Sequence, residues 1–244
     1  MRVIPVLDLY RGVVVLGRGG RRDEYRPIVS PLARDAQPAS VALGLRSTFG
    51  LTELYLADLD AIVDAKPNTT VWSELVARGW RLLVDAGIDS VAAAQQVIAI
   101  GATPIVGLES CGDPALLGEI IAACGTGNVI FSLDLVAGRP KTTSPLWPDD
   151  PLEIATRAVE LGVSRLLVLD LAGVGMAAGI RGLELVTAIH TRWPELELIT
   201  GGGVRSVADL ESLARIGVAG VLVASALHNG QLTAADISRV QNEE

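Results

Sequence analysis

Two aspartates in matching surroundings are the first candidates for chemistry in this sequence. Asp8 follows the apolar segment Val3–Leu7, and Asp134 follows the apolar segment Val129–Leu133. At both places the letters Leu-Asp-Leu precede a nearby glycine. Two carboxylates that face one substrate can act as general acid and general base if their surroundings separate their pKa values. The alternative is that each carboxylate caps a loop backbone or pairs with an arginine.

A second group of residues could hold an anion. The segment Thr200–Ser206 contains three consecutive glycines, and glycines after a strand let backbone N–H groups approach an anion closely. Ser206 can cap the helix that follows, whose N-terminus carries positive partial charge. The predicted phosphate ligands are Gly202, Gly203, Arg205, Ala224 and Ser225. The alternatives are a tight turn without a ligand and a surface position for Arg205.

Short apolar segments that alternate with helical patterns must position these residues. The predicted strands are Val3–Leu7, Glu53–Leu56, Arg81–Val84, Pro104–Leu108, Val129–Leu133, Arg165–Leu169, Leu196–Thr200 and Gly220–Ala224. This alternation predicts a parallel sheet, and eight strand–helix units favour an α/β fold, the closed (β/α)8 TIM barrel. Active sites of such barrels lie at the carboxyl ends of the strands, where Asp8 and Asp134 would face each other.

The sequence also contains an internal repeat, which predicts two similar half-barrels. No break in composition divides it, so we expect a single domain over residues 1–244 with half-barrels of about 1–125 and 126–244. The letters AGIDSVA in the first half correspond to GGVRSVA in the second, so Asp85 replaces the first of the three glycines. A carboxylate repels phosphate. The first half is therefore expected to bind an amino or cationic group there, or to use Asp85 structurally.

Further candidates lie in the loops that follow the predicted strands. The polar loop Gly17–Pro27 is rich in arginine and would lie at the catalytic face, where loops carry substrate contacts. Trp147 could fold over a flat substrate ring or simply pack. Asp58 and Asp170 form a second acidic pair with a secondary or structural role, and His228 is a proton shuttle or a surface residue. The predicted substrate contacts are Arg22, Tyr25, Arg26, Asp85, Trp147 and Asp170.

Composition and charge limit the classes of molecule that the protein is expected to bind. The chain has 244 residues and a formal net charge of −8, with no basic run, which argues against nucleic acid or an anionic membrane as the main partner. No apolar run reaches the length of a membrane span, and Met1 leads directly into a predicted strand, so we expect a cytoplasmic protein without a signal peptide. The two cysteines lack metal spacing. The sequence predicts no cofactor and no metal, unless Asp58, Asp85, Glu109 and Asp170 converge on a cation.

Taken together, these motifs resemble the histidine-biosynthesis barrels, which comprise an isomerase and a cyclase. The resemblance rests on Leu-Asp-Leu with Gly12, Ser-Leu-Asp at Asp134, GGGVRS and VASAL, covers essentially the whole chain and is closer to the isomerase. It implies that Asp8 and Asp134 are base and acid of an Amadori rearrangement, and that Trp147 stacks on the substrate. The isomerase of that family binds a substrate with two phosphates.

The sequence departs from that pattern at four places. Asp85 stands at the phosphate glycine of the first half, Asp170 lies where the family has its catalytic threonine region, and Leu16 replaces an expected arginine. The loop GRRDEYRP resembles a HisA/HisF-related branch of methanogens, methylotrophs and planctomycete-type bacteria. That branch is associated with one-carbon and tetrahydromethanopterin metabolism.

Three functions remain open from the sequence. The first is a divergent isomerase-type enzyme that acts on a small molecule with one phosphate, with Arg22, Tyr25 and Arg26 closing over it. The second is the histidine-pathway isomerase with an altered phosphate grip. The third is a non-catalytic barrel that binds a phosphorylated ligand. The oligomeric state is open, a monomer included.

Overall fold

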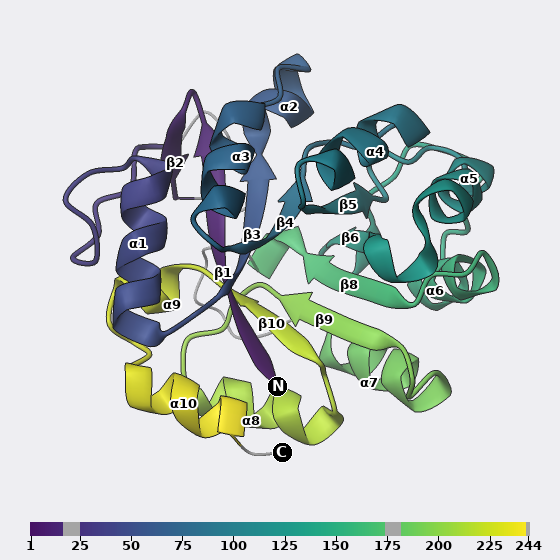
Figure 1. Cartoon of the computed structure of the whole chain (residues 1–244). Coiled ribbons are helices and arrows are strands. Elements are labelled where there is room, and N and C mark those ends of the chain that lie inside the picture. The colour runs from purple at the N-terminus through teal and green to yellow at the C-terminus, as the bar shows by residue number, and fades with distance from the viewer. Residues whose placement is uncertain (17–24, 174–181, 243–244) are drawn as a thin grey trace.

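A computed structural model describes residues 1–16, 25–173 and 182–242 and shows a closed ring of parallel strands surrounded by helices (Figure 1). The barrel strands are β1 (Arg2–Tyr10), β3 (Glu53–Asp58), β4 (Arg81–Asp85), β5 (Thr103–Gly107), β6 (Ile130–Val136), β8 (Arg165–Asp170), β9 (Glu197–Gly201) and β10 (Gly220–Val223). Each pairs in parallel with the next, and β10 pairs with β1 to close the ring. The predicted (β/α)8 barrel is confirmed.

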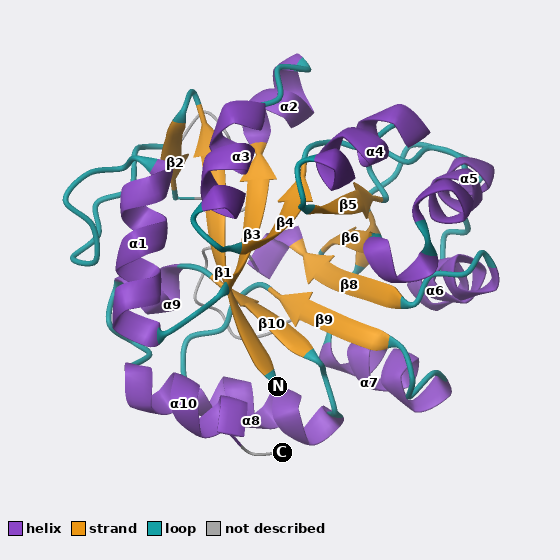
Figure 2. Cartoon of the chain, in the orientation of Figure 1, coloured by secondary structure: helices purple, strands orange, loops and turns teal. Residues whose placement is uncertain are grey.

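Helices cover the outside of this ring (Figure 2). They are α1 (Pro38–Phe49), α2 (Leu59–Asp64), α3 (Thr69–Ala77), α4 (Val91–Ala99), α5 (Pro114–Cys124), α6 (Pro151–Glu160), α7 (Leu183–Arg192), α8 (Val207–Ile216), α9 (Ser225–His228) and α10 (Ala234–Asn242). Side-chain caps define several starts: Asp113 and Asp150 accept N–H bonds directly before a proline that opens the helix. The short helices α2 and α9 were not predicted, because neither is long enough to show a helical period.

Two short hairpins extend the barrel at its carboxyl end. Strand β1 turns into β2 (Val13–Val15), and β6 turns into β7 (Arg139–Pro140), both antiparallel. Arg11 and Gly12 have φ of 52° and 76°, and Ala137 and Gly138 have φ of 52° and 79°. Positive φ at both central residues is what a two-residue hairpin turn requires, so the same turn occurs at equivalent places in the two halves.

Strand alternation decides which side chains enter the barrel. Successive residues of a strand point to opposite faces, so positions two apart share a face. An apolar cluster inside the barrel receives a side chain from every barrel strand: Ile4, Tyr55, Leu83, Ile105, Ile130, Leu167, Ile199 and Leu222. Counting in twos from Ile4, Leu83 and Ile130 leads to Asp8, Asp85 and Asp134, which therefore face inward. A larger apolar cluster fills the space between the strands and the helices.

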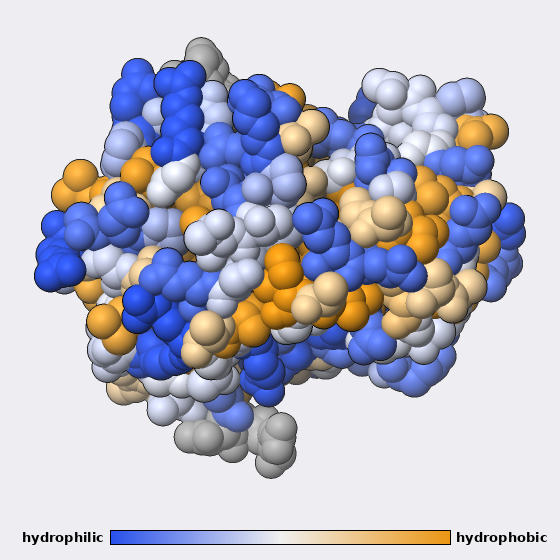
Figure 3. All heavy atoms as spheres, turned by 45° about the horizontal axis from the view of Figure 1, so that its top comes forward, coloured by the Kyte–Doolittle hydropathy of each residue, from blue (hydrophilic) through white to orange (hydrophobic). Residues whose placement is uncertain are grey.

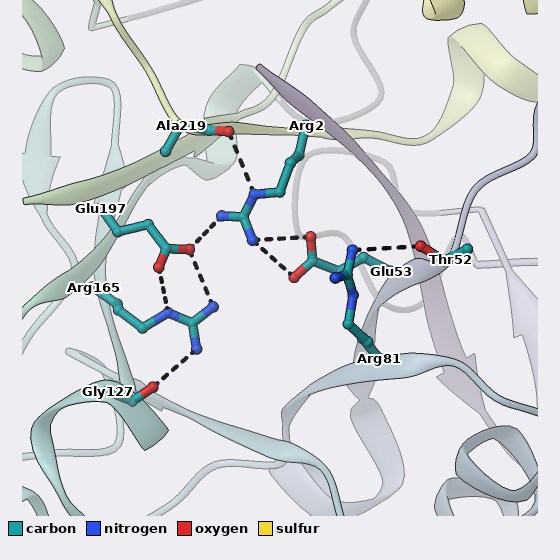
Figure 4. A network of polar contacts seen from close by, with 8 residues as sticks. All are labelled: Arg2, Thr52, Glu53, Arg81, Gly127, Arg165, Glu197 and Ala219. Atoms are coloured by element: carbon teal, nitrogen blue, oxygen red, sulfur yellow. Dashed lines mark hydrogen bonds and ion pairs between the residues drawn. The ribbon is translucent and has the colours of Figure 1, made fainter. Parts of the chain in front are cut away.

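Ion pairs link the amino ends of several barrel strands (Figure 4). Arg2 pairs with Glu53 at 3.1 Å and also with Glu197, and Arg165 pairs with Glu197 at 2.9 Å. These residues stand at the starts of β1, β3, β8 and β9. In barrels of this kind the amino-terminal face serves stability, so this network ties neighbouring strands together away from the chemistry.

No helix in residues 1–16, 25–173 or 182–242 combines the length and the apolar character needed to cross a bilayer. The face shown in Figure 3 mixes hydrophilic residues with smaller hydrophobic areas.

Candidate active site

A cavity of about 280 Å³ opens at the carboxyl ends of the barrel strands. Its floor and walls are largely apolar, with contributions from Val6, Ala57 and Leu169 among others. The polar side chains that line it are Asp8, Tyr25, Tyr55, Asp85, Glu109, Ser110, Asp134, Lys141, Ser225 and His228. An apolar cavity with a few convergent polar groups is the usual form of a binding site for a small molecule.

Asp134 is an acid in this cavity whose pKa is strongly raised. It is buried on β6, and its Oδ1 accepts a hydrogen bond from the Ser132 hydroxyl at 2.7 Å. Burial and the negative charge of Asp85 raise the pKa of Asp134 from 3.8 to about 7, against the opposing effects of Ser132 and Lys141. A carboxyl with this pKa exchanges a proton near neutral pH, which is the property of a general acid or base.

Asp8 lies on the opposite wall. Strands β1 and β6 are separated by three strands in either direction around the closed ring, so the two acids face each other across the cavity as predicted. Tyr55 also lines the cavity: burial raises its pKa well above 10.0, and the charges of Asp85, Asp134 and Asp8 add to that rise. All three aspartates are thus near enough to this phenol to disfavour its ionisation.

Asp85 is held by two hydrogen bonds. The Tyr55 hydroxyl donates to Asp85 Oδ2 at 3.1 Å, and the Gly87 backbone N–H donates to Asp85 Oδ1 at 3.4 Å. Burial raises the pKa of Asp85 above its usual 3.8, although both hydrogen bonds act in the opposite direction. The predicted position of Asp85 in the site therefore agrees with its place in the cavity wall.

Glu109 and Lys141 form an ion pair on the same side of the cavity as Asp85. Lys141 Nζ lies 2.5 Å from Glu109 Oε2, and both side chains line the cavity. The backbone N–H of Lys141 donates to the carbonyl of Asp134 at 2.8 Å, which places this lysine beside the candidate acid. Counting Asp85, Glu109 and Asp134 against Lys141, this end carries two more negative than positive groups when all are ionised.

The glycine segment lines the other end. Gly202 and Gly203 have φ of 87° and 90°, in the left-handed region that favours glycine, and both face the cavity together with Ala224 and Ser225. Arg205 does not line it in the described structure: its guanidinium is half-exposed and lies 3.7 Å from Asp209. Asp209 also accepts the N–H groups of Arg205 and Ser206. The side chain of Arg205 thus lies beside Asp209, which forms the capping box of α8 with Ser206, and not in the cavity where the prediction put it.

His228 is buried rather than on the surface. Its Nδ1 lies 2.8 Å from the Ser30 hydroxyl, and its ring lines the cavity near Ser225. Burial lowers the pKa of His228 from 6.5 to about 4, so the ring is neutral at neutral pH. A neutral ring near the glycines can offer one hydrogen bond to a ligand without adding charge.

Asp170, predicted to contact substrate, holds the backbone instead. Its two carboxylate oxygens accept the N–H groups of Ala137, Gly138 and Ala172 at 2.9–3.0 Å. The reason is alternation: Leu169 lines the cavity, so the next residue faces the outside of the barrel. Asp170 therefore secures the turn between β6 and β7.

Asp58 lies on the outside for the same reason. It accepts hydrogen bonds from Asn68 and from Trp72 Nε1 at 2.9 Å. Asp58 and Asp170 therefore do not converge with Asp85 and Glu109 on a cation. Within the described residues, no three His, Cys, Asp or Glu side chains are grouped to hold a metal ion.

Trp147 is likewise a core residue in this structure. Its ring stacks on Phe131 with centroids 5.4 Å apart, and its Nε1 donates to the Cys111 carbonyl at 2.7 Å. Phe131 belongs to the apolar layer between β6 and the helices, so the two rings lie on the opposite side of the strand from the cavity. The expectation that Trp147 covers the substrate is corrected to a packing role.

The arginine-rich loop is described only in part. Arg22 lies outside the described residues. Tyr25 lines the cavity, and the exposed Arg26 donates to the backbone carbonyl of Tyr25 at 2.8 Å. Tyr55 and Lys141 were missed by sequence reasoning. The available signal for Tyr55 was a tyrosine among the apolar residues of a predicted strand. No local pattern distinguished Lys141.

The chain is similar to known proteins over nearly its whole length. A family model described as "Histidine biosynthesis protein" matches residues 2–233. The 1-(5-phosphoribosyl)-5-((5-phosphoribosylamino)methylideneamino) imidazole-4-carboxamide isomerase of Thermus thermophilus is 30% identical over 98% of this chain and 99% of its own length. The isomerase of the same name from Halobacterium salinarum is 31% identical over 96% and 94%. An uncharacterized protein of Methanocaldococcus jannaschii is 28% identical over 97% of both chains.

Proposed function

The chain belongs to the histidine biosynthesis protein family and is an isomerase-like enzyme, and from that premise we propose that it isomerises a phosphorylated small molecule with Asp8 and Asp134 as its proton-transfer pair. The observation that carries the proposal is Asp134, whose pKa of about 7 lets it hold a proton at neutral pH opposite a second carboxylate. A pair with separated proton affinities is what acid–base isomerisation needs.

The roles follow from the surroundings of each acid. Asp134 is the acid: in an Amadori rearrangement it gives its proton to the ring oxygen of an aminoaldose, and the C1–O bond breaks to leave a protonated Schiff base at C1. Asp8 is the base that removes the proton from C2, which gives an enol-amine. The enol-amine then gains a proton at C1 and loses the proton of its C2 hydroxyl, which yields the aminoketose. The proton held by Asp134 is available because burial and Asp85 disfavour its ionised form.

The glycine end of the cavity would hold the substrate phosphate. Gly202 and Gly203 present backbone without side chains there, and Ser225 follows on the adjacent strand end. In this barrel architecture the loops after the seventh and eighth strands are the frequent phosphate site. None of the acids that line the described cavity comes from β9 or β10, so phosphate meets less repulsion at that end.

Two substrates fit this chemistry. The relatives support the histidine-pathway substrate, whose enzyme name contains two phosphoribosyl groups. Asp85 favours a different substrate with one phosphate, as in the branch associated with one-carbon metabolism, because a carboxylate lines the first-half end of the cavity.

Turnover of the histidine-pathway aminoaldose by the wild type, Asp8→Asn and Asp134→Asn tests the proposal. If the wild type is active, each variant should lose at least about a hundredfold in kcat, as expected for loss of a general acid or base. An active Asp8→Asn or Asp134→Asn variant would contradict the assigned roles. If the wild type does not turn over this substrate but binds ribose 5-phosphate, the singly phosphorylated substrate class is favoured.

A further inference from the structure

The two halves of the barrel place different groups at equivalent backbone positions. Asp85 pairs with Ile105 between β4 and β5, just as Gly201 pairs with Leu222 between β9 and β10. The helices that follow begin at equivalent serines, Ser90 and Ser206, each of which accepts an N–H bond with its side chain. The register therefore equates Asp85 with Gly201.

Only one of these positions tolerates a side chain. A Cβ on Gly201 would lie 2.6 Å from the Cβ of Leu222, so this position has no room for a side chain. The next two glycines line the cavity. At Asp85 the side chain fits and lines the cavity itself. The second half thus offers backbone to a ligand where the first half offers a carboxylate.

The carboxylate of Asp85 uses the backbone donor that a ligand would need. Gly87 is the equivalent of Gly203, and its N–H points to Asp85 Oδ1 at 3.4 Å. Oδ2 is held by the Tyr55 hydroxyl at 3.1 Å. The first half therefore already has a carboxyl group of its own in the place that corresponds to the proposed phosphate site.

We propose that the side chain of Asp85 occupies the anion-binding turn of the first half and restricts the enzyme to substrates with a single phosphate. The inference rests on the phosphate site proposed at Gly202 and Gly203. A second phosphate would have to displace the carboxylate from the Gly87 N–H and would meet Glu109, whose charge Lys141 balances. The substrate class is thus a monophosphate whose other end carries no phosphate.

Calorimetric titration with inorganic phosphate tests this directly. The wild type should bind one phosphate per chain, and Asp85→Gly, which restores the residue of the second half, should bind two. Asp85→Asn is the matched control: it keeps the size of the side chain that fills the turn and should still bind one. Asp85→Ser, with a small neutral side chain, replaces the glycine variant if that variant does not fold.

A second measurement compares ribulose 5-phosphate with ribulose 1,5-bisphosphate. Asp85→Gly should bind the bisphosphate at least about tenfold more tightly than the wild type does, with unchanged affinity for the monophosphate. Two phosphates on the wild type, or a single phosphate on folded Asp85→Gly and Asp85→Ser, would overturn the inference. In the double variant Asp85→Gly/Gly203→Ala, one bound phosphate would show that the turn of the first half binds phosphate independently of the site proposed at Gly203. Loss of binding in Gly203→Ala alone would support the site proposed in the second half.

Discussion

The pKa of Asp134 makes stability depend on pH in a direction that can be calculated. Its folded-state pKa of about 7 lies above the ordinary value of 3.8, so the folded protein binds a proton that the unfolded chain has already released. Stability contributed by this group is therefore fully present below pH 4 and is lost as the pH rises to 7. Over the whole pH range this group changes the free energy of unfolding by about 4 kcal/mol, of which about 3 kcal/mol falls between pH 5 and pH 8.

Urea unfolding of the wild type and Asp134→Asn at pH 5 and pH 8 measures this difference. The amide has no proton to lose, so the variant should gain about 3 kcal/mol relative to the wild type between the two pH values. Asp149→Asn, at an exposed aspartate, is the control and should show no such gain. A stability difference between the wild type and Asp134→Asn that is equal at both pH values would refute the assignment.

The same proton should govern activity. If Asp134 is the general acid, kcat/KM falls as the pH rises above about 7, because the ionised form has no proton to give. A rate that instead rises through pH 7 would make Asp134 the base and reverse the roles assigned to the two aspartates.

Three further substitutions and one control variant test roles in stability. Trp147→Phe should lower the free energy of unfolding by about 1–3 kcal/mol through loss of a buried hydrogen bond, with KM unchanged in the isomerase assay. Gly201→Ala should cost about 1–3 kcal/mol because its Cβ would overlap Leu222, whereas Gly112→Ala, with open space around it, should change stability by less than about 0.5 kcal/mol in the same denaturation experiment. Glu197→Gln should cost about 1 kcal/mol at pH 7. Burial alone would raise the pKa of Glu197, but its two arginine partners hold that pKa below 4.5, so the loss should shrink as the pH falls below 4.5 and the carboxyl becomes protonated.

The order of the elements and the mouth aspartates could be predicted because they depend on local patterns. Apolar segments of strand length, each followed by a helical period, recur along the chain, and eight of them in a parallel sheet close into a barrel. The predicted strands Glu53–Leu56, Arg81–Val84 and Arg165–Leu169 begin at the same residues as β3, β4 and β8. Strand ends were less accurate: β1 continues to Tyr10, so Asp8 lies within the strand, because the hairpin to β2 extends its hydrogen bonding.

What the sequence determined by itself was the set of residues at the carboxyl end of each strand, since that depends only on where an apolar segment stops. Tertiary structure decided which of them share the cavity, because neighbouring residues of a strand point to opposite faces and only the closed ring defines the inside. Asp170 therefore binds a backbone turn, while Asp134 lines the cavity. The contact between Tyr55 and Asp85 joins the neighbouring strands β3 and β4, and no local pattern encodes such a contact.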